Sequence, residues 1–176
     1  AAASGRVGVC IATSGPGAVH LLNGLYDARM DHVPVVAIVG QTMRGALGSA
    51  FQQEVDLVTL FKDVASDFVA QATVPSQVRH LIDRAVRIAH DRRTVTCVVL
   101  PNDLQQMPCE EPPMAHGSTH TGVGLPIDAS LPPAEELQHA ADVLNEGRRV
   151  AILVGAGALG AAGELIDVAD TLQACC

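Results

Sequence analysis

Four short runs of apolar, mostly β-branched residues constrain the fold of this chain more than any other feature. They cover residues 7–12, 33–39, 95–100 and 150–154, and few polar side chains interrupt them. Strands of this composition are buried on both faces, which is typical of a parallel sheet covered by helices. The runs alternate with segments of helical periodicity. The alternation predicts an α/β fold: a three-layer parallel sheet flanked by helices, with right-handed crossovers.

Three segments carry apolar residues at helical spacing. They are residues 18–30, 76–90 and 134–146. Ser76 can cap the start of the second segment, and Gly147 can stop the third. The first two predicted helices fall between predicted strands, as crossover connections require.

The chain divides into two predicted domains. Prolines crowd residues 105–132, where apolar periodicity is weak, and this favours an inter-domain linker. Residues 1–104 then form a first domain, and residues 133–176 open a second α/β unit. One strand and two helices cannot close a core, so we expect the second unit to be truncated. We also expect apolar patches to be exposed where elements are missing.

Charge and composition exclude several classes of protein. The chain has 11 Lys and Arg against 19 Asp and Glu, a net charge of −8, so it offers no basic surface for nucleic acid or anionic lipid. No apolar run reaches the length of a membrane helix, so no integral membrane segment is predicted. The five Cys form no CxxC pair and no secretory leader is evident, which predicts reduced thiols and a cytoplasmic location.

Two glycine-rich turns are candidate sites. Residues 13–17 (TSGPG) lie directly after one predicted strand and before a helix, and their spacing fits either a phosphate cradle or a tight turn. Residues 155–160 satisfy G-x-G-x-x-G, which fits either a nucleotide site or a packing turn. His20 and Asn23 share one helix face near the first turn.

A third candidate site follows the strand that ends near Gln41. Residues 48–54 (GSAFQQE) place two amides and a carboxylate beside an aromatic ring. They fit a ligand-contact loop at the carboxyl end of a strand or, alternatively, the polar start of a helix.

Several of these motifs together resemble the thiamine-diphosphate-dependent enzymes of the pyruvate oxidase and acetolactate synthase group. Residues 133–173 resemble the opening of the central domain of the same enzymes. The motifs that carry the resemblance are Gly8–Gly17, His20–Ala28, Val33–Ile38, Gly40–Gln41, Phe51–Glu54, Leu57–Asp63 and Leu100–Asp103.

The resemblance implies an architecture and a set of cofactors. Residues 1–104 would be a pyrimidine-binding domain that lacks its N-terminal part, and residues 133–176 the start of the central domain. Thiamine diphosphate would lie across a subunit interface of a homodimer or homotetramer. Its diphosphate and Mg²⁺ would sit on a domain absent from this chain, and FAD is a further candidate cofactor.

The resemblance also implies roles for particular residues. Phe51 with Gln52 or Gln53 would face the substrate, and which glutamine does so stays open because this chain has one residue more than the usual Phe-Gln-Glu pattern. No metal ligand is predicted. The implied cofactor-binding residues are Ser14, Gly15, Pro16, Gly17, His20, Asn23 and Gln41.

The implied function is that of a 2-keto-acid decarboxylase or carboligase. The family's catalytic Glu precedes the first of the strands seen here, and the seven residues before that strand contain no carboxylate. We therefore expect a fragment that carries half of the cofactor pocket and is inactive alone. The alternative is a non-catalytic α/β module for binding or oligomerisation.

Overall fold

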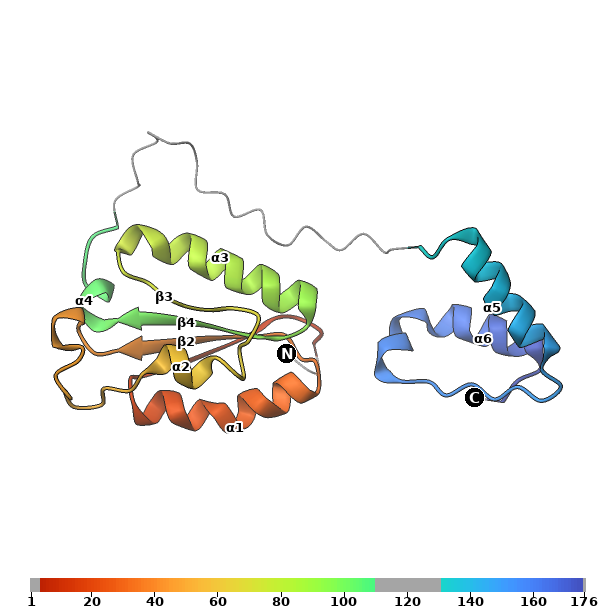
Figure 1. Ribbon diagram of the computed structural model, residues 1–176, viewed down its shortest axis with the longest axis horizontal. Coiled ribbons are helices and arrows are strands. Elements are labelled where there is room, and N and C mark those ends of the chain that lie inside the picture. The colour runs from red at the N-terminus through yellow and green to blue at the C-terminus, as the bar shows by residue number, and fades with distance from the viewer. Residues whose placement is uncertain (1–3, 110–130, 176) are drawn as a thin grey trace, which may run out of the picture. The chain divides into compact units, whose positions relative to one another are not determined.

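The computed structural model describes residues 4–109 and 131–175 and divides into two compact units (Figure 1). Most of the predicted linker, residues 105–132, lies outside the described residues. The two units are therefore described separately.

The first unit is built on a four-stranded parallel sheet. β2 and β4 form its centre, and nearly every residue of β4 is buried because both faces are covered. The α/β class and the first three predicted strands are thus confirmed, while the short β3 was not predicted. The spatial order is β1 (Gly8–Ala12), β2 (Val35–Gln41), β4 (Val95–Pro101), β3 (Val69–Gln71).

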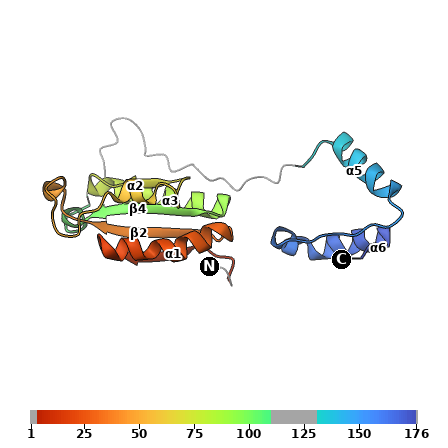
Figure 2. The same ribbon diagram turned by 60° about the horizontal axis from the view of Figure 1, so that its bottom comes forward.

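Helices cover both faces of this sheet. α1 and α2 share one hydrophobic core with the strands, and α3 builds a second core with them. Figures 1 and 2 show the strands between α1 and α3. None of the helices in the described part of the chain is long and apolar enough to cross a bilayer. The helices of this unit are α1 (Pro16–Met30), α2 (Leu57–Phe61), α3 (Pro75–Arg92) and α4 (Asn102–Gln105), with a 3₁₀ turn η1 (Arg44–Ala46).

The starts of the two long helices follow from their local sequences. Pro16 occupies the first turn of α1, where its missing N–H costs no hydrogen bond. At α3 the predicted cap, Ser76, is not the one used. The side-chain oxygen of Gln77 instead accepts hydrogen bonds from the N–H groups of Thr73 at 2.7 Å and Val74 at 3.4 Å. The residue that caps α3 therefore lies inside the helix, in its first turn, and its side chain reaches back to the residues before the helix.

The core on the α1 side contains the largest fully buried side chain of the described residues. Phe61 of α2 is 0% exposed and packs with Leu25 of α1 and Val39 of β2. Cys97 of β4 lies in the same core, and burial raises the pKa of its thiol to about 12. The thiol is therefore protonated at neutral pH and behaves as a small apolar group.

β1 is an edge strand with one bare face. Val9 and Ile11 are 58% and 74% exposed, although their partners in β2, Val36 and Ile38, lie in the core under α3. α3 thus covers β2 on this face but leaves β1 open. The expectation of exposed apolar side chains is confirmed at this edge.

The second unit differs in part from its prediction. The predicted helix 134–146 is present, with Gly147 after it, but the predicted strand 150–154 is wrong. Among the residues that the structure describes, this run makes one isolated parallel bridge, from Ala151 to Cys175, and no other strand pairs with the rest of it. The glycine-rich segment forms a 3₁₀ turn before the last helix. The elements are α5 (Ala134–Glu146), η2 (Ala156–Ala161) and α6 (Ala162–Leu172).

Truncation of Phe61 tests the core between α1, α2 and the sheet. We expect Phe61→Ala to lower the free energy of unfolding by about 3–5 kcal/mol, because the lost contacts leave a cavity. Urea unfolding followed by circular dichroism measures the loss. The matched control is Phe51→Ala, because the Phe51 side chain lies in a loop and Phe51 is 48% exposed. This substitution should lower the free energy of unfolding by less than about 1 kcal/mol. Equal losses in the two variants would contradict this description of the core.

Candidate functional site

A cavity of about 930 Å³ lies at the carboxyl ends of β1, β2 and β4. Its floor is apolar and includes Ile11, Ile38 and Leu100 from the strands and Ile82 from α3. These side chains place it on the face of the sheet that α3 covers. Ligands of parallel α/β sheets bind at this edge, beyond the carboxyl ends of the strands.

The glycine–proline turn, residues 13–17, forms one wall of the cavity. Thr13 and Ser14 line it directly. Gly15 has φ 64° and ψ −119°, a conformation that other residues rarely adopt. A Cβ on Gly15 would lie 2.8 Å from the Cβ and the carbonyl oxygen of Gln53. Glycine is therefore required here both by the backbone conformation and by the close approach of a second segment.

That second segment is the loop of residues 48–54, which forms another wall. Phe51, Gln52 and Gln53 line the cavity. The helix that follows starts only at Leu57, where the Asp56 carboxylate accepts a hydrogen bond from the Thr59 N–H at 3.1 Å. The helix start is therefore wrong for residues 48–54. That these residues form a ligand-contact loop stays a prediction.

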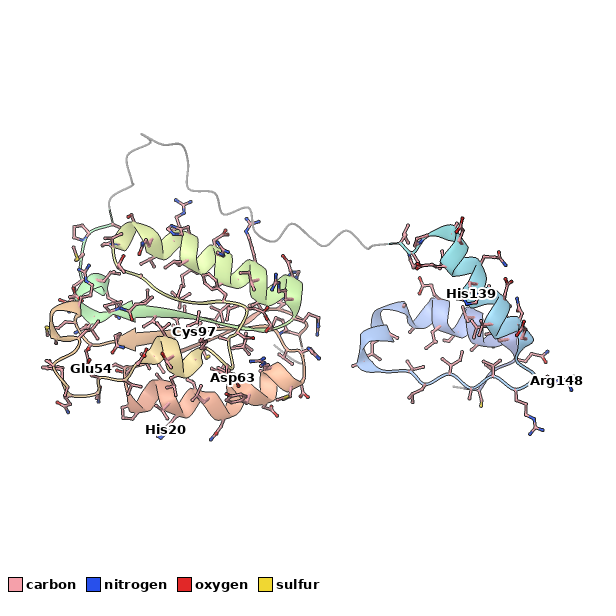
Figure 3. All side chains as sticks on the ribbon, in the orientation of Figure 1. His20, Glu54, Asp63, Cys97, His139 and Arg148 are labelled. Carbon is pink, nitrogen blue, oxygen red and sulfur yellow. The ribbon has the colours of Figure 1, made fainter. Side chains whose placement is uncertain are left out.

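Glu54 closes the same loop on itself. Its carboxylate accepts hydrogen bonds from the N–H groups of Gly48 at 2.6 Å and Phe51 at 3.0 Å. These two backbone donors lower the pKa of Glu54 below its usual value. Figure 3 shows Glu54 in this loop, at the end of the sheet where β2 and β4 finish. No sequence pattern indicated this use of the carboxylate.

Gln41, at the end of β2, supports the loop from below. Gln41 is only 3% exposed and lines the cavity. The amide nitrogen donates to the Val55 carbonyl at 2.8 Å, and the amide oxygen accepts from the Thr42 N–H at 2.8 Å. Both polar ends of Gln41 are thus used inside the protein, where they hold the segment that carries the loop.

An ion pair joins two of the segments that leave this edge. Arg44, after β2, donates from Nε to Asp103, after β4, at 2.7 Å, and its backbone N–H donates to the same carboxylate at 3.0 Å. These contacts lower the pKa of Asp103. The Arg44 guanidinium also donates to the Thr73 carbonyl after β3. One arginine therefore connects the ends of three strands, and no sequence motif indicated this.

Comparison with known proteins shows what this chain is similar to. Residues 1–60 match the family model of the thiamine pyrophosphate enzyme, N-terminal TPP binding domain. The chain is 36% identical over 172 residues to the pyruvate oxidase of Lactiplantibacillus plantarum and 33% identical over 178 residues to the acetolactate synthase of Arthrospira platensis. It is 36% identical over 170 residues to acetolactate synthase 1, chloroplastic, of Oryza sativa subsp. japonica.

Residues 1–60 of this chain are thus similar to the N-terminal TPP binding domain of thiamine pyrophosphate enzymes, and nearly the whole chain is similar to the three relatives. The three alignments cover 94% to 98% of the chain but only 25% to 30% of the length of each relative. The chain thus corresponds to a little more than a quarter of these enzymes.

The predicted cofactor-binding residues do not all meet at the cavity. Ser14 and Gln41 line it, whereas Gly15, Pro16 and Gly17 shape the turn behind it. His20 and Asn23 are exposed on α1, across the sheet from α3. Figure 3 shows His20 pointing away from the sheet.

The cavity suits the ring of the family's cofactor better than it suits a phosphate. Its lining contains no Lys, Arg or His among the described residues, so an anion would meet no cationic side chain there. Ile11, Ile38 and Ile82 offer apolar surface to a flat ring, and the Ser14 hydroxyl and Gln52 amide lie beside them. In the described part of the chain no three His, Cys, Asp or Glu side chains group as metal ligands.

A methyl group at residue 15 tests the contact between the turn and the loop. We expect Gly15→Ala to lower the free energy of unfolding by at least about 1 kcal/mol, because it strains the backbone and pushes against Gln53. The matched control is Gly45→Ala, where nothing lies within 4 Å of the new Cβ. Urea unfolding should show a change within about 0.5 kcal/mol for that control. A loss in Gly45→Ala as large as in Gly15→Ala would contradict the proposed contact.

Proposed function

We propose that this chain is part of a thiamine-diphosphate-dependent 2-keto-acid decarboxylase or carboligase of the pyruvate oxidase or acetolactate synthase type. In this proposal the first unit supplies part of the pocket for the cofactor's aminopyrimidine ring. The observation that carries it is the cavity at the carboxyl ends of β1, β2 and β4, where the glycine–proline turn and the 48–54 loop meet. The names of the relatives support the reaction class.

The turn and the apolar floor have separate roles in this proposal. Ile38 and Ile82 would offer apolar surface to the ring, and Ser14 would offer it a hydroxyl. Gly15 lets the turn lie against Gln53, and Gly17 leaves room for the Thr13 side chain. When bound, thiamine diphosphate supplies the electron sink that permits a 2-keto acid to lose CO₂.

Hydrogen bonding separates the roles of the two glutamines. The Gln53 side-chain oxygen accepts a hydrogen bond from the Ser14 hydroxyl at 3.2 Å. Gln52 lines the cavity and has no side-chain hydrogen-bond partner among the described residues. Gln52, with the half-exposed Phe51 ring, is therefore the pair that we assign to face the substrate.

The proton-transfer group is proposed to lie outside this chain. No Asp or Glu among the described residues lines the cavity, and Glu54 uses both carboxylate oxygens on backbone donors. Mg²⁺, FAD and a homodimeric or homotetrameric assembly are proposed for the longer enzyme on the resemblance alone.

Binding of the isolated ring tests the proposed pocket. We expect 4-amino-5-hydroxymethyl-2-methylpyrimidine, added to the ¹⁵N-labelled chain, to shift the amide resonances of Thr13, Ser14, Gln52 and Thr42, because these residues line the cavity. Inorganic pyrophosphate is the control ligand and should leave the same resonances in place. Shifts caused by pyrophosphate alone would instead support a phosphate site and contradict the proposal.

A turnover assay tests the absence of the proton-transfer group. We expect the 176-residue chain, with thiamine diphosphate and Mg²⁺ added, to release no CO₂ from pyruvate above a protein-free blank. The physical reason is that no carboxylate of the described residues reaches the cavity. Release of ¹⁴CO₂ from labelled pyruvate measures the rate. Turnover that disappears on heat denaturation of the protein would overturn this part of the proposal.

A further inference from the structure

The loop of residues 48–54 is held in a strained conformation. Three of its residues have positive φ angles: 88° at Gly48, 55° at Ala50 and 64° at Gln53. Two of the three carry side chains, for which this backbone region is unfavourable. Such strain persists only where surrounding contacts hold the segment in place, and it clusters at functional sites. The contacts that hold this loop are therefore informative about its role.

The first of these contacts is internal to the loop. Each oxygen of the Glu54 carboxylate accepts one backbone hydrogen bond, from Gly48 at 2.6 Å and from Phe51 at 3.0 Å. The Glu54 N–H in turn donates to the Phe51 carbonyl at 2.9 Å. Hydrogen bonds to an ionised acceptor are about twice as strong as neutral ones. Phe51 is thus bound to Glu54 through both its N–H and its carbonyl.

The second contact fastens the loop to the glycine–proline turn. The Ser14 hydroxyl donates to the Gln53 side-chain oxygen at 3.2 Å. Beneath it, the backbone of Gln53 lies against Gly15, where even a methyl group would come within 2.8 Å. Gln53 therefore touches the turn through its side chain and its backbone together.

We propose that Glu54 and Gln53 are positioning residues that lock the 48–54 loop onto the 13–17 turn, so that Phe51 and Gln52 are presented to the cavity. This proposal rests on the proposed function for the identity of what Phe51 and Gln52 meet. Glu54 sets the shape of the loop, and Gln53 sets its place against the turn. This chain has one glutamine more than the family's Phe-Gln-Glu pattern. With two glutamines, Gln53 holds the loop against the turn and Gln52 contacts the substrate.

Amide exchange by NMR on the full chain tests the part played by Glu54. We expect Glu54→Gln to raise the solvent exchange rates of the Gly48 and Phe51 amides at least tenfold, because the neutral amide retains one acceptor oxygen where two were used. The amides of Val36 and Val98 in the central strands should exchange as before. In the unchanged chain the Gly48 and Phe51 amide resonances should move together as the Glu54 carboxyl titrates, and in Glu54→Gln neither should move.

Conservative variants separate positioning from general stability. Glu54→Asp keeps the charge on a shorter side chain and should restore part of the protection at Phe51. If Glu54→Gln also raises the exchange rates of the Val36 and Val98 amides, the test instead compares the Gly48 and Phe51 exchange rates of Glu54→Asp with those of the unchanged chain. Unchanged exchange at Gly48 and Phe51 in both variants would overturn the role of Glu54.

A double-mutant cycle tests the fastening of the loop to the turn. Ser14→Ala and Gln53→Ala should each raise the exchange rate of the Phe51 amide. In the double variant this amide should exchange no faster than in the faster single variant, because both substitutions remove the same hydrogen bond. Effects that multiply in the double variant would mean that the two side chains act independently, which overturns the lock.

The outcomes for the lock and for the proposed function are distinguishable. Faster exchange in Glu54→Gln without binding of the aminopyrimidine to the unchanged chain would support the lock and contradict the function. Binding of the aminopyrimidine with unaltered exchange in Glu54→Gln would support the function and overturn the lock.

Discussion

The parallel pairing of β2 with β4 is the constraint on which the rest of the first unit depends. The two strands pair from Val35 with Val95 to Gln41 with Pro101, and both are largely buried. Because they run in the same direction, the segments that follow them leave the sheet at one edge. β1 joins the same sheet in parallel and brings the glycine–proline turn to that edge. The cavity is the space that these segments enclose.

Polar contacts keep that edge open and ordered. Apolar packing ends where the strands end, so the exit segments are held by hydrogen bonds and one ion pair. Gln41 holds the start of the loop segment, Arg44 and Asp103 join the exits of β2 and β4, and Glu54 closes the loop. Strained backbone at Ala50 and Gln53 is tolerated because these contacts leave the loop no relaxed alternative.

Prediction from sequence succeeded where one local pattern dominates. Long apolar runs located β1, β2 and β4, and helical periodicity located α1, α3 and α5. β3 was missed because three half-buried residues make no distinctive run. The strand expected at 150–154 was wrong because an apolar run becomes a strand only beside a partner, and in the described part of the chain this run makes a single bridge. His20 and Asn23 are cofactor-binding residues by resemblance, and that role stays a prediction; the structure places them exposed on α1, on the face of the sheet opposite α3.

The sequence by itself determined the layered α/β class, the position of the glycine–proline turn and the resemblance to thiamine-diphosphate-dependent enzymes. These depend on hydrophobic spacing and on residue types close together in the chain. Only the tertiary structure decided that Gln53 contacts Ser14, how Glu54 is used and that Arg44 meets Asp103. Those facts depend on contacts between distant residues, such as Ser14 and Gln53, which are 39 positions apart. No local pattern encodes the distance between two side chains that the folded sheet brings together.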